Sequence, residues 1–385
     1  MRNPRLLLLP VLVASLAALP PSPLGAADQS TIRIGAILAV TGPNANLGTP
    51  EARTLQMLAD QANAAGGISG RKVQIIVKDS QGSAEKAVSF AKQLIEEEDV
   101  LAIIGPSTTG ESMKLKGLCD DSEVILLSCA AGETIVNPVA RWVFKVAPMD
   151  RFAAQMIFST MKKMGISRIG ALCSNSGFGQ GGKAQLLKLA PEAGITVAIA
   201  EDYDKDATDL TGVLTKIRGQ DVQAVVNWST EPAQSIVLKN IRQMGFDVPV
   251  FQSHGFGNLA YAAAAGKAAE GTLFPCGRIL VADALPASNP QKAVLTAYKA
   301  AYVKRYAEEP STFGGHAWDS FTLLADAVRH VGTDRGKVRD YLESVKGFVG
   351  TAGIFNFSAS DHNGLSMDAF EMLTVKDGRF ALLAR

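Results

Sequence analysis

Asn63-Ala-Ala-Gly-Gly-Ile-Ser-Gly-Arg-Lys-Val-Gln-Ile-Ile-Val-Lys-Asp79 carries three structural signals in one short stretch. Its first residues end an amphipathic helix, and Gly66 and Gly67 can adopt the positive φ angles that stop a helix. Gly70 permits a second tight turn. The β-branched run from 73 to 77 then predicts a buried strand that ends at an acidic residue.

The same order of helix, turn and strand recurs along the chain. Near-continuous runs of Ile, Val and Leu alternate with amphipathic segments, which predicts parallel sheets covered by helices on both faces. The expected strands are 32–40, 73–78, 100–104, 124–127, 168–173, 196–200, 224–227, 248–252 and a terminal hairpin of 369–375 and 379–383. Residues 143–148 lead into a second unit, and after 272–274 the chain returns to long helices. The expected helices are 50–64, 83–97, 110–118, 149–164, 182–193, 210–218, 232–244, 289–306, 312–331 and 334–345. Two successive β-α-β-α units suggest two similar lobes.

The first 27 residues have the pattern of a cleaved secretion signal. Arg2 and Arg5 precede an apolar stretch, Leu6 to Leu19, and small residues follow at Gly25-Ala26-Ala27. A retained membrane anchor is the alternative, but a span needs about 20 apolar residues. No cysteine lies near the cleavage site, which argues against a lipoprotein. We expect a periplasmic protein that begins near Ala27 or Asp28.

Composition narrows the classes of function. Loss of Arg2 and Arg5 changes the formal net charge from +1 to −1, and no basic run follows, so a nucleic-acid partner is not expected. Apolar residues make up 47% of the chain, which fits a well-packed globular protein. The length favours two domains.

Four cysteines follow the signal, which permits disulfides in an oxidising compartment. Of the three possible pairings, Cys119–Cys129 with Cys173–Cys276 keeps each pair within one expected lobe. The alternative is four small buried hydrophobic residues. Sequence alone does not decide between them.

The order of elements, with the stretch 63–79 after an export signal, resembles the periplasmic substrate-binding proteins of branched-chain amino acid ABC transporters, the leucine-binding protein family. The resemblance covers nearly the whole mature chain. It implies the type I periplasmic-binding-protein fold, an α/β fold of two doubly wound parallel-sheet lobes joined by three hinge crossovers. The crossovers would fall near 145–148, 277–279 and 354–357. The expected lobes are then residues 28–147 with 279–355, and residues 148–278 with 356–385.

Ligands in open parallel sheets collect beyond the carboxyl ends of the strands. In the first lobe, Gly105 to Gly110 precedes a helix, where unpaired N–H groups and the helix dipole favour an anion. Simple N-capping by Ser or Thr is the alternative. By resemblance, this loop and the Ser-x-Ala-Ala segment would bind a ligand carboxylate. The predicted contacts are Gln81, Ser107, Thr108, Thr109, Ser128, Ala130 and Ala131.

In the second lobe, aromatic residues follow three of the expected strands. They would close over the apolar body of a ligand, although such residues also commonly fill cores. The predicted contacts are Phe178, Trp228, His254 and Phe256.

Two positions depart from the pattern of the amino acid-binding members. By resemblance, a Glu that pairs with the ligand ammonium is replaced by His254, and a Thr that follows Ser-x-Ala-Ala is replaced by Gly132. Because a buried unpaired cation is costly, we expect an aromatic, keto or hydroxy acid that lacks an α-ammonium. Glu231 or Asp202 could instead supply the charge, and the ligand would then be a branched-chain or other hydrophobic amino acid.

Rival functions have weaker support. Gly177-x-Gly179-x-x-Gly182 formally matches the dinucleotide fingerprint of an NAD-dependent enzyme, but Ser174-Asn175-Ser176 separates it from the strand. No hydrolase, protease or P-loop motif occurs, and the four histidines lack metal-ligand spacing. We therefore expect no enzyme activity, cofactor or metal. A receptor ectodomain or a cytoplasmic amide sensor would share the fold, but a free exported module fits transport better.

The sequence thus predicts a solute-binding protein that closes around a small carboxylate-bearing ligand by a hinge motion. By resemblance, its partners would be ABC permease and ATPase subunits. We expect the protein to be a monomer.

Overall fold

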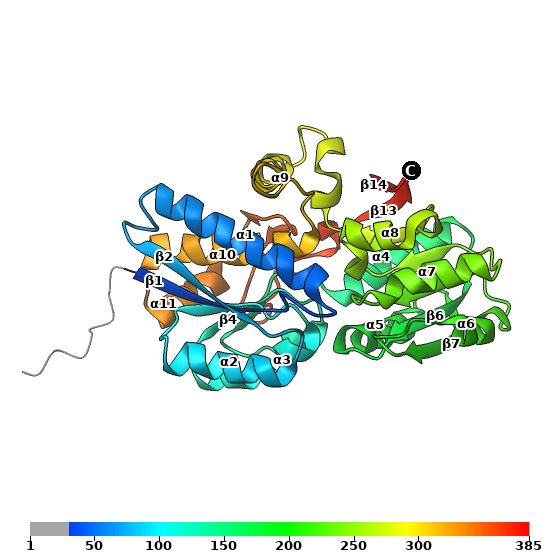
Figure 1. Cartoon of the computed structure of the whole chain (residues 1–385), viewed down its shortest axis with the longest axis horizontal. Coiled ribbons are helices and arrows are strands. Elements are labelled where there is room, and N and C mark those ends of the chain that lie inside the picture. The colour runs from blue at the N-terminus through cyan, green and yellow to red at the C-terminus, as the bar shows by residue number, and fades with distance from the viewer. Residues whose placement is uncertain (1–30, 385) are drawn as a thin grey trace, which may run out of the picture. The chain divides into compact units, whose positions relative to one another are not determined.

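A sheet of five parallel strands forms the first lobe of the protein (Figure 1). The computed structural model describes residues 31–384, which lie in one compact unit. In order across the sheet, the strands are β2 (Lys72–Asp79), β1 (Thr31–Leu38), β3 (Ala102–Ile104), β4 (Ile125–Ser128) and β5 (Val143–Lys145). Every neighbouring pair is parallel, as the Ile/Val/Leu-rich runs predict.

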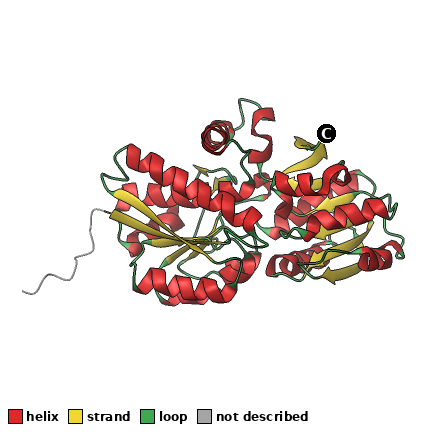
Figure 2. Ribbon diagram, in the orientation of Figure 1, coloured by secondary structure: helices red, strands yellow, loops and turns green. Residues whose placement is uncertain are grey.

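Helices cover both faces of this sheet, because successive side chains of a strand point to opposite sides. Ile34 and Ile37 of β1 accordingly lie in two separate hydrophobic clusters. One face packs against α1 (Ala45–Ala64), α10 (Thr312–Val331) and α11 (Arg335–Ser344), and the other against α2 (Ala84–Glu96) and α3 (Thr109–Asp121). Figure 2 shows the resulting layers of helices around strands.

The turn between α1 and β2 is held by a side-chain clamp. The Asn63 amide donates to Val73 O and its oxygen accepts from Val73 N, both at 2.8 Å. Gly66 and Gly67 have φ values of 95° and 86°. A Cβ at Gly67 would lie 2.1 Å from the carbonyl oxygen of Arg71, so the turn requires glycine there.

A sheet of seven strands forms the second lobe. Its order is β14 (Arg379–Leu382), β13 (Glu371–Lys376), β10 (Leu273–Cys276), β9 (Val250–Gln252), β8 (Ala224–Trp228), β6 (Arg168–Ser174) and β7 (Thr196–Tyr203). The pairs from β10 to β7 are parallel, whereas β13 and β14 pair antiparallel, as the Asp377-Gly378 turn predicts. The fold is therefore α/β with two doubly wound lobes.

The helices of the second lobe also divide between two faces. One cluster contains side chains of α4 (Asp150–Lys163) and α5 (Gly177–Leu189), and the other contains side chains of α6 (Thr211–Arg218), α7 (Ala233–Gln243) and α8 (Leu259–Ala265). The helix expected at 182–193 begins earlier, because Ser176 accepts a hydrogen bond from Gly179 N at 3.2 Å and caps it. The helix at 259–265 was not predicted.

The remaining elements belong with the first lobe. The helix α9 (Lys292–Tyr306) packs on α1 through a small cluster that joins Leu295 to Met57. A short antiparallel ribbon of β11 (Phe348–Val349) and β12 (Ile354–Phe355) follows α11.

The chain passes between the two sheets at three places. The first two lie between β5 and α4 and after β10, near the positions expected from the sequence. The third lies later than 354–357, because Phe357 and Leu365 still pack in the core of the first lobe and the chain joins the second sheet at β13. Asn363 donates to Lys145 O at 3.0 Å, so the first and third passages lie side by side. The exact lobe limits stay a prediction.

All four cysteines are buried and free, so the disulfide pairing is wrong and they act as small hydrophobic residues. The sheets explain this result. Cys119 and Cys129 lie in clusters on opposite faces of the first sheet, and Cys173 and Cys276 lie on opposite faces of the second.

The signal peptide predicted for residues 1–27 lies outside the described residues. Between residues 31 and 384, the longest helices do not have the length and apolar character needed to cross a membrane.

Candidate functional site

A cavity lies where the strand ends of both lobes meet. From the first lobe it is lined by residues that follow β3 and β4, and from the second lobe by residues that follow β6, β8 and β9. The lining residues are Leu47, Ser107, Thr108, Thr109, Cys129, Ala130, Ala131, Phe178, Thr230, His254, Gly255, Phe313 and His316. We call this space the cleft cavity. Seven of its lining residues were predicted as ligand contacts: Ser107, Thr108, Thr109, Ala130, Ala131, Phe178 and His254.

The hydroxyl groups of Ser107 and Thr108, in the loop that follows β3, form hydrogen bonds with other groups of the first lobe. Ser107 donates to Glu51 and accepts from Ala39 N at 3.0 Å. Thr108 forms a capping box with Glu111, in which its Oγ1 accepts from Glu111 N at 3.3 Å. The side chains thus hold the loop in shape. The cap uses the amide of Glu111, so the amides of Thr109 and Gly110 at the start of α3 are the donors that remain for a ligand anion.

Gly132 allows Thr109 to fill the space beside the Ser-x-Ala-Ala segment. A Cβ at Gly132 would lie 2.3 Å from Thr109 Cγ2. The Thr109 hydroxyl accepts a hydrogen bond from Gly132 N at 3.2 Å. The threonine expected by resemblance at 132 therefore has no room, and Thr109 supplies a hydroxyl in the same neighbourhood from α3.

Four predicted contacts do not line the cavity. Ser128 is fully buried and bonds Ser112 at 2.8 Å, and Trp228 and Phe256 are fully buried in the two clusters of the second lobe. Gln81 is exposed and accepts from Lys86. The strand ends were read correctly, but sequence does not show which side chain at each end turns inward to the core.

The two lobes are in close contact beside the cavity. A Cβ at Gly177, the first residue of α5, would lie 3.2 Å from the backbone nitrogen of Gly110 at the start of α3. The N-terminal ends of two helices from different lobes thus approach each other. Both ends carry partial positive charge, which favours an anion near this boundary.

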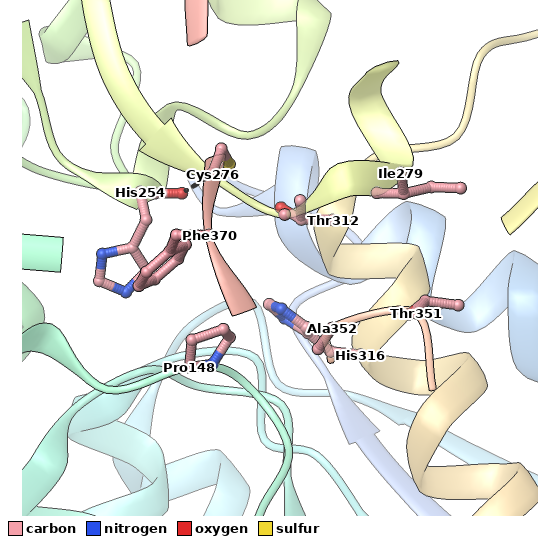
Figure 3. Close-up of a pocket in the computed structure, with 10 residues that line it drawn as sticks. Pro148, His254, Cys276, Ile279, Thr312, His316, Thr351, Ala352 and Phe370 are labelled. Atoms are coloured by element: carbon pink, nitrogen blue, oxygen red, sulfur yellow. Dashed lines mark hydrogen bonds between the residues drawn. The ribbon is translucent and has the colours of Figure 1, made fainter. Parts of the chain in front are cut away.

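A second cavity lies next to the first and shares His254 and His316 with it. Its other lining residues are Pro148, Cys276, Gly277, Ile279, Thr312, Thr351, Ala352 and Phe370. Pro148, Gly277 and Phe370 come from the three passages between the lobes, so we call this space the hinge cavity. Figure 3 shows His254 and His316 on opposite sides of it, with Phe370 between them in this view.

Sequence reasoning missed His316, which enters from α10, far along the chain. His316 and His254 are each 6% exposed. Both ring nitrogens of His254 and Nδ1 of His316 lack a hydrogen-bond partner. Only the pairing of α10 with the first sheet brings the two histidines together.

Burial keeps both imidazoles neutral. It lowers the pKa of His254 well below its usual value, and the positive charge of Lys145 adds to this effect. Burial and Lys145 likewise lower the pKa of His316 to about 3, although a hydrogen bond with the backbone of Cys129 acts in the opposite direction. Each imidazole can then offer one donor and one acceptor.

Two buried charged groups lie behind the histidines. Asp150 Oδ1 lies 3.6 Å from His254 Nε2. Lys145 is fully buried and donates to Pro148 O at 3.2 Å. Burial raises the pKa of Asp150, and Lys145 opposes that rise; burial also lowers the pKa of Lys145, and Asp150 opposes that fall.

The side chains that line the two cavities, both built from described residues, include no carboxylate. Glu231 accepts from Ser229 Oγ at 2.7 Å within its own loop. Asp202 forms an ion pair with Lys183 at 2.9 Å. Glu231 and Asp202 were the two candidates for a carboxylate that pairs with a ligand ammonium, and neither lines the two cavities.

Gly179 and Gly182 of the dinucleotide-like motif allow neighbouring atoms to pack closely against α5. A Cβ at Gly179 would lie 2.0 Å from Ser174 O, and one at Gly182 would lie 2.2 Å from Trp228 Nε1. Both glycines lie inside α5 instead of in a phosphate-binding turn. Among residues 31–384, no three His, Cys, Asp or Glu side chains come together as a metal site.

Two doubly wound lobes, joined at three passages and enclosing a cavity at their strand ends, define a two-lobed solute-binding protein. The family described as periplasmic binding protein matches residues 31–379. The chain belongs to this family.

Known proteins agree with this assignment. The chain is 26% identical over 321 residues to the leucine-, isoleucine-, valine-, threonine- and alanine-binding protein of Pseudomonas aeruginosa, with 82% of each chain covered. An extracellular ligand-binding receptor from Rhodopseudomonas palustris HaA2 superposes with a TM-score of 0.86 at 28% identity, covering 91% of this chain and 99% of that one. The branched-chain amino acid transporter substrate-binding protein LivJ from Streptococcus pneumoniae, solved with isoleucine, gives 0.80 at 27% identity, covering 91% and 97%. These relatives are binding proteins, which supports a non-enzymatic role at the level of the family.

Proposed function

We propose that the protein binds a small hydrophobic solute with a carboxylate in the cleft cavity and delivers it to an ABC importer. The observation that carries the proposal is the cavity itself, which is lined by loops of both lobes. A ligand that contacts both lobes stabilises the closed arrangement, and the closed form is what a membrane permease would recognise. The permease and ATPase would be other chains, and the binding protein would act as a periplasmic monomer.

The first candidate ligand is a branched-chain amino acid. The relatives support it, because one is named for leucine, isoleucine and valine and another was solved with isoleucine. In this case the amides at the start of α3 would hold the carboxylate. The ammonium would need an acceptor, and the neutral ring of His254 in the cavity lining can accept a hydrogen bond.

The second candidate is a carboxylic acid without an ammonium. The absence of a carboxylate among the side chains that line the two described cavities favours it, because an ammonium buried there would lack a counter-charge. The buried Lys145 and Asp150 behind the histidines carry opposite charges and offset each other. The lining of the two cavities is therefore the feature that suits an anion better than a zwitterion.

Calorimetric titration with leucine, isoleucine, valine, 4-methyl-2-oxopentanoate and benzoate tests the proposal. We expect one binding site per chain for at least one compound. His254→Ala should weaken that binding by about fivefold or more, the equivalent of about 1 kcal/mol for a buried hydrogen bond. His330→Ala removes an exposed imidazole and should leave affinity unchanged. Lack of binding by all five compounds would contradict the proposal.

A further inference from the structure

The hinge cavity offers a ligand an apolar space with few free polar groups. Pro148, Ile279, Ala352 and Phe370 contribute carbon surface. The two hydroxyl groups in its wall already donate to protein atoms, Thr312 to Gly257 O at 3.3 Å and Thr351 to Asp319 at 3.1 Å. This lining suits a hydrocarbon chain or ring.

The two histidines are the exception in this lining. Their three unpaired ring nitrogens are more than nine-tenths buried. A buried donor or acceptor without a partner costs about 1–3 kcal/mol. Because each neutral imidazole has one donor and one acceptor, a hydroxyl group can satisfy both kinds of nitrogen, whereas a neutral carbonyl oxygen satisfies only an N–H donor.

The order of these features along the two cavities is fixed by the fold. The amides of α3 lie at the cleft cavity, His254 and His316 line both cavities, and the apolar wall lies at the hinge. A ligand that fills both cavities therefore meets an anion site, then a pair of neutral hydrogen-bonding groups, and then an apolar space.

We propose that His254 and His316 select a 2-hydroxy or 2-oxo acid, whose neutral oxygen lies between the two imidazoles and whose apolar side chain enters the hinge cavity. This inference rests on the proposed binding function and refines its second candidate. Asp150 Oδ1 lies 3.6 Å from His254 Nε2, too far for a hydrogen bond, so this nitrogen is free to contact the ligand. The hinge cavity also gives the side chain a direct effect on closure, because all three passages between the lobes line it.

Four compounds that differ in one substituent test this inference: leucine, 2-hydroxy-4-methylpentanoate, 4-methyl-2-oxopentanoate and 4-methylpentanoate. Calorimetry with the full mature protein should show that the hydroxy or oxo acid binds about tenfold or more tightly than 4-methylpentanoate, the value of one buried hydrogen bond. It should also bind more tightly than leucine. This comparison uses only the wild-type chain, so it does not depend on the folding of a variant.

Variants then test which residues cause the preference for the hydroxy or oxo acid. His316→Phe should remove most of the advantage of the hydroxyl or oxo group over 4-methylpentanoate, while leaving the affinity for 4-methylpentanoate itself within about threefold. Ala352→Leu, which fills the hinge cavity, should weaken 2-hydroxy-4-methylpentanoate more than the shorter 2-hydroxypropanoate. Ala130→Leu, in the cleft cavity, is the matched control and should weaken both acids. Thermal unfolding of each variant checks that it is folded.

The outcomes separate this inference from the binding function. If leucine binds tenfold more tightly than the hydroxy and oxo acids, the selection by the histidines is overturned, while the proposed function stands with its first candidate ligand. If the hydroxy, oxo and unsubstituted acids bind equally, the role of the histidine pair is also overturned. If no compound of the four binds, the inference is overturned, and the proposed function then depends on whether isoleucine, valine or benzoate binds in the wider series.

Discussion

The side chain of Thr109 occupies the space that a side chain at Gly132 would need. This pair sets the shape of the first-lobe wall of the cleft cavity, because Thr109 Cγ2 lies 2.3 Å from a Cβ built on Gly132. The glycine has φ −54° and ψ 128°, which other residues also adopt, so the restriction is steric. Gly132 is therefore a packing residue and not a simple loss of a ligand contact.

We expect Gly132→Ala to lower the free energy of unfolding by about 1–3 kcal/mol, the usual effect of forcing extra volume into a packed site. Adding Thr109→Ala should recover part of the loss, because it removes the opposing methyl and hydroxyl groups. A double-mutant cycle by urea denaturation measures this coupling. Strict additivity of the two changes, or a Gly132→Ala effect under about 0.5 kcal/mol, would contradict the steric account.

His316 makes the stability of the protein depend on pH. Burial lowers its pKa from 6.5 to about 3, so between these values the unfolded chain binds a proton that the folded protein does not. This group therefore costs stability as pH falls below 6.5, by up to about 1.4 kcal/mol per pH unit. Above pH 6.5 its contribution does not change.

His316→Phe should accordingly flatten the decline in unfolding free energy between about pH 6.5 and pH 4. The measurement is urea denaturation at a series of pH values. His330→Phe, which removes an exposed imidazole from the same helix, is the control. An unchanged slope in His316→Phe would show that the buried imidazole is not kept neutral.

At the scale of elements, the N-termini of α3 and α5 limit how closely the lobes approach. Gly177→Val places a branched side chain against the backbone of Gly110, where a Cβ alone would already lie 3.2 Å from the nitrogen. The closed form should become less populated, and the apparent affinity should fall in proportion.

We expect at least about tenfold weaker binding of leucine or 4-methyl-2-oxopentanoate, whichever the wild type binds, with little change in thermal stability. Gly212→Val is the matched control, because it lies in the first turn of α6 and a Cβ there meets no heavy atom within 4 Å. Equal effects of the two substitutions on affinity would contradict a role for the contact between α3 and α5.

Most elements could be predicted from the sequence, because Ile/Val/Leu runs and helical periodicity report burial directly. The start of α5 was missed because Gly177 and Gly179 read as loop residues, although Ser176 supplies a cap. The helix α8 also had a readable signal, an Asn258 cap before a run of alanines. In both cases, the glycine content or the shortness of the segment was given more importance than the residue that caps the helix.

The site was less predictable than the elements. Strand ends indicated the right loops, and seven of the predicted contacts line the cleft cavity. Whether a side chain at a strand end packs in the core or lines the cavity depends on its neighbours across the sheet, however. The sequence therefore did not distinguish Trp228, which lies in the core, from Phe178, which lines the cavity. His316 was missed because its position depends on α10 packing against a sheet formed some 200 residues earlier.

At the scale of the whole molecule, the hinge cavity connects ligand recognition to the three passages between the lobes. The first and third passages are tied by hydrogen bonds from Asn363 to Lys145 O and Ala147 O at 3.0 and 2.9 Å. A ligand in the two cavities would contact the passages as well as both lobes. Binding and closure would therefore be coupled.

Small-angle scattering of the mature protein, with and without a saturating ligand from the calorimetric series, measures whether the two lobes close on binding. We expect a smaller radius of gyration with ligand, because the lobes close around the occupied cleft cavity. Binding that is saturated by calorimetry but leaves the radius of gyration unchanged would contradict closure of the two lobes around the solute.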